Sequence, residues 1–300
     1  MKSFNEIYEQ VYKENNDEMS KLKLKKKSAT ILFIVSIVIA WIFLLNLSNK
    51  FEAGVVIVSI SAVIILITLI VSYNSTYRRM FKTNIIYAFV KNVDKNLTYY
   101  PNKGISTIMY RKGEFERFDE FSSEDSIEGI LDDKYKIKMA EVHAQNVIQD
   151  SEGNTSRTTI FRGIFGNIEC IKDTHIKLKV RSDKGVLGNL FKSKSKIEMD
   201  SSEFEKYFDI TADDKIGAMQ ILTSDLMALM IEFREESNIR YEFTLNNNQI
   251  YLRFHIGDVF EPKYFKDALD YDTLKNYYDI INFVFGVARE INKAIENTEI

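Results

Sequence analysis

The chain has 300 residues, of which 45% are hydrophobic and 28% are charged, and its formal net charge is −3. This composition excludes a disordered, collagen-like or low-complexity protein. The balance of both charge signs excludes the broad basic surface that nucleic-acid binding requires. A single cysteine, Cys170, excludes an intrachain disulfide framework and a zinc site built from several cysteines.

Two long stretches of the sequence contain no charged residue, at positions 28–48 and 53–77. Each is as long as the roughly 20 apolar residues that a helix needs to cross the hydrocarbon core of a bilayer. We therefore predict two membrane-spanning helices, at about 28–48 and 53–75. The alternative is a pair of buried helices in a soluble protein, but core helices of this length carry a polar stripe that is missing here.

Only residues 49–52 separate the two spans, so the sequence predicts a transmembrane hairpin over 28–77. Five lysines lie between positions 21 and 27, and basic residues at 78, 79 and 82 follow the second span. The positive-inside rule then places both termini in the cytoplasm, which predicts a multi-pass protein of the cell's inner (plasma) membrane. No ionisable residue lies within either span, which argues against a transporter acting alone.

The segment 1–27 is predicted to be a cytoplasmic amphipathic helix, because Phe4, Ile7, Tyr8 and Val11 recur at helical spacing. Two interpretations of its apolar side remain open. It either docks on the cytoplasmic domain or a partner protein, or it is only the lead-in to the first span.

Residues 78–300 are predicted to form a cytoplasmic α+β domain with a mainly antiparallel sheet and packed helices, because the hydrophobic period changes from helical to two. Strands that follow each other closely favour antiparallel pairing, with the helices on one face. A change of phase after residue 139 predicts a bulge near Ala140. The predicted elements are a helix from the second span to about Val93, strands at 134–139, 158–171 and 176–181, a helix capped by Ser224, a hairpin of strands 239–245 and 250–256, a helix from Pro262 to Leu269, and a final helix at 272–296.

Several strings in this region share their order with a known family: EDSIEGILDDKYKIKMAEVHAQ, FRGIFG, SSEFEKYFDITADD, ILTSDLM and IRYEFTLNNNQIYLRF. The chain resembles an uncharacterised bacterial membrane protein family, domain of unknown function 3137, from about Tyr87 to Asn292. The resemblance implies paired spans followed by a cytoplasmic domain. It brings no established activity and no catalytic residue. The family tends to place an arginine before the ILT segment, where this chain has Ala218, Met219 and Gln220.

The histidines are the first place to look for chemistry. Glu141 and His143 share one face of a predicted strand and are candidates for a metal site or an acid–base pair, but a solvated or hydrogen-bonded strand histidine explains the pattern better. His255 is expected to be exposed on the polar face of the hairpin, and His175 is expected in a loop. Because no nucleotide-binding, hydrolase or metalloprotease motif occurs, we predict no catalytic, cofactor-binding or metal-binding residue.

Three further features bear on function: Cys170, Arg162 and the segment 185–196. Cys170 is expected to be a core thiol. Arg162 stands within an apolar stretch, so either its strand edge is wet or it forms an ion pair with Glu169 or Glu141. The segment 185–196 mixes apolar residues with lysines, which suits either contact with an anionic membrane surface or a plain loop between strands.

The missing motifs and the apolar spans favour a non-enzymatic, membrane-tethered interaction or regulatory domain. One alternative is a membrane-anchored enzyme that acts on a lipid or cell-envelope intermediate, with Glu141 and His143 as its candidates. Another is a subunit of an oligomeric membrane assembly. The expected partners are the lipid bilayer and either a protein partner or further copies of the chain, with no nucleic acid and no cofactor.

Overall fold

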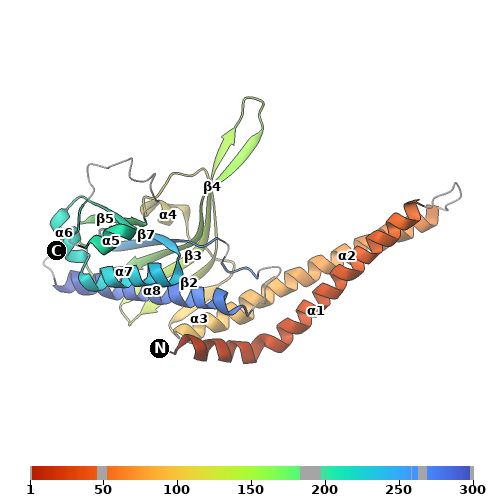
Figure 1. The fold of residues 1–300 in the computed structure, drawn as a ribbon, viewed down its shortest axis with the longest axis horizontal. Helices are drawn as coiled ribbons and strands as arrows, with labels where there is room; N and C mark the ends of the chain where they lie inside the picture. Colours follow the sequence, from red (N-terminus) through yellow and green to blue (C-terminus); the bar gives the residue numbers. More distant parts are fainter. Residues whose placement is uncertain are drawn as a thin grey trace. The chain divides into compact units, whose positions relative to one another are not determined.

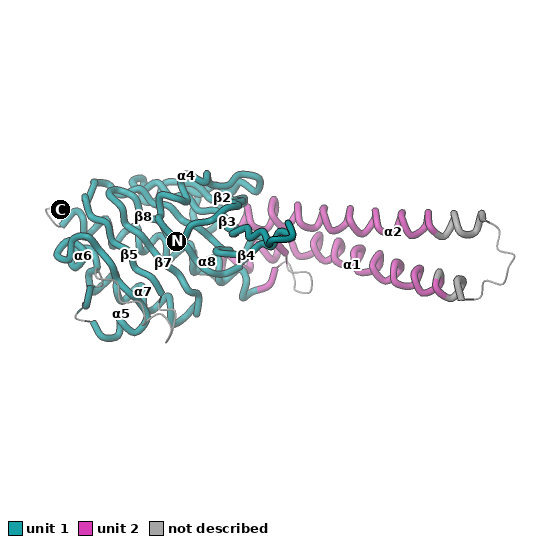
Figure 2. Tube along the Cα trace, turned by 90° about the horizontal axis from the view of Figure 1, so that it is seen from above, with its two compact units in different colours: residues 1–4, 90–260, 271–300 teal, residues 5–89, 261–270 magenta. Residues whose placement is uncertain are grey.

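The computed structural model describes residues 2–45, 53–182, 197–199, 201–257, 259–262 and 269–297. The chain divides into two compact units (Figure 2). Unit 1 consists of residues 1–4, 90–260 and 271–300, and unit 2 consists of residues 5–89 and 261–270.

Unit 2 is built from two long helices that run side by side (Figures 1 and 2). Helix α1 (Phe4–Leu45) continues without a break from the segment predicted as an N-terminal helix into the first apolar stretch. Helix α2 (Ala53–Met80) is extended by a π-helical turn, η1 (Phe81–Ile86), and by α3 (Tyr87–Val93), so the predicted continuation of the second span to Val93 is confirmed. The predicted turn at 49–52 lies outside the described residues.

One helical stretch among the described residues, Ile60–Val93, is long and apolar enough to cross a membrane. The helices α6 (Lys215–Ile221) and α7 (Ser224–Ser237) pass the same test only when the pair, which is bent by 69°, is counted as one broken span. Three polar contacts tie unit 2 together near one end of the long helices. Lys26 Nζ donates to Asn74 Oδ1 at 2.9 Å, and both Arg78 and Lys82 form ion pairs with Glu261.

Unit 1 contains a sheet of eight strands in the order β1-β2-β3-β4-β8-β7-β5-β6. All neighbouring strands are antiparallel, which confirms the predicted α+β class with an antiparallel sheet. The strands are β1 (Leu97–Tyr100), β2 (Glu120–Leu131), β3 (Tyr135–Gln149), β4 (Thr155–Glu169), β5 (Lys177–Ser182), β6 (Phe208–Ala212), β7 (Arg240–Asn246) and β8 (Gln249–His255).

The predicted strands are present, and β4 is central, between β3 and β8. The β7–β8 hairpin turns at Asn247, whose φ of 54° lies in the left-handed region that asparagine tolerates. A bulge does lie at the predicted position, but in the neighbouring strand: the register of β2 against β3 shifts between Glu124 and Ile127, so two residues of β2 face Ala140. The register of β3 against β4 shifts separately, between Ala144 and Gln145. The apparent change of phase arises because residues 139–142 are all buried, on both faces of the sheet.

Helices cover both faces of the sheet. On one face, α7 and α8 (Tyr271–Asn297) pack through stacked rings of Phe233 and Phe283, whose centroids are 4.2 Å apart, and Phe283 also contacts Tyr241 of β7. On the other face lies α4 (Thr107–Lys112), whose Tyr110 ring packs against Phe165 of β4 at 5.2 Å. Ile164 and Phe254 are register partners and point to the same face, where the Phe254 ring contacts Phe283. Phe165, the next residue of β4, therefore points to the opposite face.

The expectation of helices on one face is therefore wrong, because a six-residue helix, too short to show a hydrophobic period, covers the second face. Helix α7 is capped by Thr223, whose side chain accepts from Leu226 N at 3.2 Å, rather than by the predicted Ser224. The remaining short helix is α5 (Ser202–Tyr207). Most of the helix predicted from Pro262 to Leu269 lies outside the described residues.

Candidate functional site

The face of the sheet under α4 is the chemically richer of the two. At its centre, Tyr110 lies in an aromatic cluster with Phe118, Phe161 and Phe165. Charged side chains flank this cluster, toward β1–β4 on one side and toward β5, β7 and β8 on the other. The opposite face, under α7 and α8, is mostly apolar, with the buried Glu141 as an exception, so the polar face is the candidate location of a functional site.

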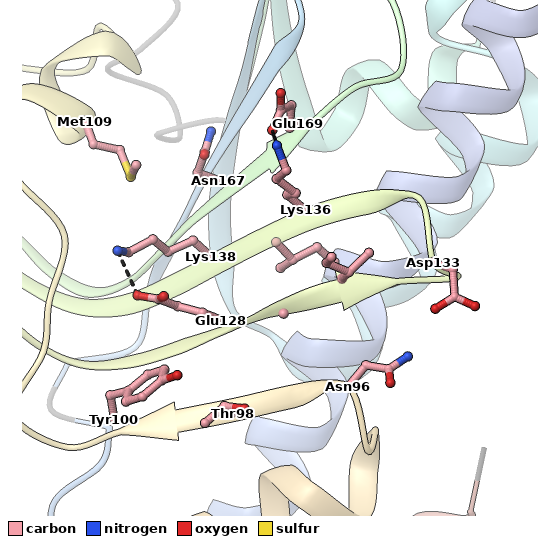
Figure 3. Close-up of a pocket in the computed structure, with 13 residues that line it drawn as sticks. Asn96, Thr98, Tyr100, Met109, Glu128, Asp133, Lys136, Lys138, Asn167 and Glu169 are labelled. Atoms are coloured by element: carbon pink, nitrogen blue, oxygen red, sulfur yellow. Dashed lines mark ion pairs between the residues drawn. The ribbon is translucent and has the colours of Figure 1, made fainter.

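A pocket of about 690 Å³ lies on the β1–β4 side of the polar face (Figure 3). Its volume falls within the roughly 300–1,000 Å³ that is typical of sites for small ligands. Its floor is a row of register partners that crosses four strands: Thr98, Glu128, Lys138 and Asn167. Residues from the next row and from α4 complete the lining, among them Tyr100, Met109, Ile130, Lys136 and Glu169.

The lysines and glutamates that line this pocket are paired. Glu128 accepts from Lys138 at 2.8 Å and from Lys103 at 2.9 Å, and Lys136 Nζ lies 3.1 Å from Glu169 (Figure 3). Partial burial raises the pKa of Glu128, but the hydrogen bonds from the two lysines outweigh this effect, so the pKa lies below its usual value. The pocket therefore presents fixed positive and negative groups beside the apolar surfaces of Met109, Ile130 and Tyr100.

Fixed charges of both signs beside apolar surface can bind a ligand or a partner segment. Among the described residues that line the pocket there is no histidine or cysteine, and its lysines and glutamates neutralise each other. A ligand or a partner segment that carries both charge signs can exchange these ion pairs for its own without leaving a charge uncompensated.

A second charged cluster surrounds Arg253, on the β7–β8 side of the polar face. The Arg253 side chain is 1% exposed, donates to Glu242 at 2.7 and 3.0 Å, and forms an ion pair with Glu116. The rings of Phe115 and Phe161 lie 4.4 and 5.4 Å from its guanidinium carbon. This packing leaves no room for a ligand at the guanidinium, so the cluster is structural.

Electrostatics in this cluster keep the ion pair charged. Burial alone would lower the pKa of Arg253. The two carboxylates raise this pKa by more than burial lowers it, so it lies above its ordinary value. Burial raises the pKa of Glu242, while hydrogen bonds from His255 and Arg253 lower it to below the ordinary value. Burial also raises the pKa of the neighbouring Tyr110 to about 12, so that phenol is neutral at physiological pH.

Glu141 and His143, the two residues predicted as candidates for an enzyme site, form separate local contacts. Glu141 is buried, and its Oε2 accepts from the backbone N–H groups of Val259 and Phe260, both at 3.2 Å. His143 Nε2 lies 3.0 Å from Thr159 Oγ1 on the neighbouring strand. Neither residue lines the pocket. Glu141 thus anchors the segment after β8, and His143 is a hydrogen-bonded strand histidine.

The other two histidines lie apart from each other. His175 is in a loop with a φ of 53°, as expected, and its side chain is 85% exposed. His255 is on the polar face of the hairpin, as expected. It is half-buried rather than exposed, because its ring packs on Phe161 at 5.2 Å and its Nε2 lies 3.8 Å from Glu242 Oε1.

Cys170 is a buried core thiol, as expected, and burial raises its pKa to about 12. Of the two interpretations of Arg162, the structure supports the wet strand edge, because the side chain is exposed at the strand surface. Glu169, one of its two expected partners, pairs with Lys136 instead. The segment 185–196 lies outside the described residues.

The comparison with family models agrees with the motif order. Residues 159–293 match the model described as "Protein of unknown function (DUF3137)". These residues form a DUF3137 domain. The match confirms the resemblance over a shorter range than the predicted 87–292. No curated protein and no solved structure matches the chain.

The pocket extends beyond the matched DUF3137 region, because only Asn167 and Glu169 of its lining belong to residues 159–293. Sequence reasoning missed the pocket. The sequence predicts the strand at 134–139 that carries Lys136 and Lys138, but no strand at 120–131 to bring Glu128 beside them. No clear signal marked that strand, because its buried positions include Asp125 and Ser126.

Proposed function

We propose that this protein is a membrane-anchored interaction or regulatory protein without catalytic activity. In this proposal α1 and α2 form a two-span hairpin in the bacterial inner membrane, and both termini and the DUF3137 domain lie in the cytoplasm. The domain binds a partner at its polar sheet face. The observation that carries the proposal is the exposed apolar surface of the two long helices.

That surface is extensive. Large apolar side chains of both helices are between 41% and 64% exposed. They are Ile31, Leu32, Ile34, Val35, Ile37, Val38, Ile39 and Trp41 of α1, and Ile60, Ile64, Ile65, Ile67, Leu69 and Val71 of α2. Soluble monomers rarely expose an apolar patch larger than about 300–600 Å². A hydrocarbon environment removes this cost, because each Å² of apolar surface taken out of water contributes about 25 cal/mol.

The flanking charges support the orientation. The lysines at 21–27 in α1 and Arg78 and Arg79 in α2 lie at the same end of the helix pair, where Lys26 bonds to Asn74. Basic residues next to a span favour the cytoplasmic side. The apolar stretches contain no ionisable residue, which supports an anchor rather than a conduction path.

The anchor is tested by membrane extraction and cysteine accessibility in cells. We expect the full chain to remain in the membrane after an alkaline carbonate wash. A membrane-impermeant maleimide should label Asn49→Cys in intact cells, and Ser151→Cys only after permeabilisation, with Cys170 giving no background because it is buried. Release of the chain by carbonate, or labelling of Ser151→Cys in intact cells, would contradict the proposal.

The interaction role is tested by in-cell cross-linking followed by mass spectrometry. Lys136 is 71% exposed in the pocket, so Lys136→Glu reverses a pocket charge without burying it. The matched control is Lys293→Glu, because Lys293 is 58% exposed on α8 and lies outside the pocket. We expect the first variant to lose cross-linked partners and the control to keep them. Equal partner sets from both variants would refute the pocket as a docking site.

A further inference from the structure

The β3–β4 hairpin extends beyond the sheet as a two-stranded arm, which we define as residues 145–159 (Figure 1). Pairing of β2 with β3 ends at Gln145, and pairing of β8 with β4 begins only at Ile164. Within the described part of the chain, the strand residues of the arm therefore form ladders almost only with each other. A two-stranded ribbon is at best marginally stable in water, so an arm of this kind needs a further partner.

The two edges of the arm differ. On the β3 edge, Gln145 O accepts from Asp119 N at 2.9 Å, and Val147 N donates to Asp119 Oδ2 at 2.8 Å. The outward backbone groups on this side thus belong to residues 145, 147 and 149, and Asp119 bonds to groups of the first two. This edge is therefore partly covered by one aspartate.

The β4 edge is open. In an antiparallel ladder, facing residues direct their N–H and C=O groups either both inward or both outward. The register partners of residues 145, 147 and 149 are Thr159, Arg157 and Thr155, so these three residues direct their backbone groups outward on the β4 side. Among the described residues no strand pairs with them.

The open edge also lacks the usual protection against pairing. Natural edge strands carry lysines, prolines or uncompensated charges. The segment 155–159 reads TSRTT, with no lysine or proline. Its one charge, Arg157, is neutralised by a bidentate ion pair with Glu120 at 2.8 and 3.0 Å.

We propose that this edge pairs with the same edge of a second copy of the chain, by antiparallel strand addition about a two-fold axis near Arg157. The edge is its own complement, because the axis places Thr155 of one copy opposite Thr159 of the other, and threonine pairs across strands are favourable. The Glu120 carboxylates keep the two copies of Arg157 from repelling each other. Two marginal ribbons thereby become one four-stranded sheet.

Energy transfer between arms tests the proposal on the full chain in proteoliposomes at high lipid-to-protein ratio. Ser151→Cys places a single reactive thiol at the arm tip, because Cys170 is buried. Antiparallel pairing about residue 157 separates the two tips by about 40 Å, at roughly 3.3 Å per residue, which is within range of common dye pairs. We expect transfer above the level of random encounters.

Matched variants identify the edge. Thr155→Pro removes an outward N–H from the open edge, and Gln149→Pro removes one from the opposite edge at the register partner. We expect association to weaken roughly tenfold or more with Thr155→Pro, since two hydrogen bonds are lost per dimer, and to persist with Gln149→Pro. Thr155→Lys and Gln149→Lys repeat the comparison without restricting the backbone.

Transfer at the random level in the parent chain, or equal behaviour of the matched variants, would overturn the proposal. The arm belongs to unit 1, so its pairing with a second copy does not depend on the proposed membrane anchor. Flotation of the liposomes separates the two. A chain that does not float refutes the anchor, and the same transfer measurement in solution then decides the arm.

Discussion

Breaking the buried ion pair of Arg253 is expected to lower stability by an amount that depends on how deeply the pair is buried. In Arg253→Met, the methionine fills the space between Phe115 and Phe161, but Glu242, with a side chain that is 4% exposed, loses its main cationic partner. Removing one member of a buried pair costs about 3–5 kcal/mol, because the remaining charge is left uncompensated. For a domain of this size, that lowers the melting temperature by roughly 6–20 °C.

The control is Arg157→Met, which breaks an arginine–glutamate ion pair at the surface. Arg157 forms a bidentate pair with Glu120, but the two side chains are 52% and 44% exposed. Exposed pairs contribute at most about 1 kcal/mol, so Arg157→Met should change the melting temperature by no more than a few degrees. Thermal unfolding of the full chain, followed by near-UV circular dichroism, measures both. Equal losses from the two variants would refute the argument from burial.

The pH dependence of the melting-temperature gap between the parent chain and Arg253→Met is an independent test. In the parent chain the pKa of Glu242 is lowered, so its stabilising contribution is present above the unfolded pKa and is lost as the pH falls through the folded value. Without Arg253, burial raises that pKa, and the penalty is largest at high pH and shrinks as Glu242 takes up a proton. The gap in melting temperature should narrow from about pH 8 to about pH 5, and a gap that widens would refute this reasoning.

Three other substitutions or probes test the fold. Glu141→Leu leaves the amides of Val259 and Phe260 without their acceptor, so we expect a loss of about 1–3 kcal/mol and faster hydrogen exchange at these two amides, whereas unchanged exchange would contradict the anchoring role. Cys170, with its pKa raised to about 12, should react with maleimide only after unfolding, and labelling of the folded chain at neutral pH would show that it is accessible. Gly163→Ala places a Cβ 1.9 Å from a carbonyl oxygen of β8, so it should cost about 3 kcal/mol or more, and an unchanged melting temperature would be inconsistent with this packing.

Strands with one wet face were predictable from the sequence. In β5, Leu178 and Val180 are fully buried while Lys177 and Lys179 point to the other face, so a period of two is visible in the letters. The β7–β8 hairpin was predictable for the same reason, together with the asparagines at its turn. The long helix α8 buries one continuous stripe, and its bounds were predicted to within one residue.

Strand β2 was not predictable, because its buried positions include polar residues. Asp125 and Ser126 are fully buried where the register of β2 shifts, and Tyr99 of β1 donates a hydrogen bond to the Asp125 carboxylate. A buried aspartate with a partner on another strand is a stable arrangement, but in the sequence it is indistinguishable from a solvated one. The pocket depends on β2, so it was hidden for the same reason.

The position of a charge on the polar face also did not reveal its burial. Arg253 and Glu242 alternate with apolar residues along the β7–β8 hairpin, and such a pattern indicates a strand with one solvated face. The structure covers that face with α4 and the residues after it, which come from more than 130 positions earlier in the chain and supply Glu116 at 2.8 Å from the Arg253 guanidinium. Periodicity therefore identifies the face of a side chain, while its dielectric environment depends on which distant segment packs over it. Here that difference separates a pair whose disruption costs several kcal/mol from one whose disruption costs at most about 1 kcal/mol.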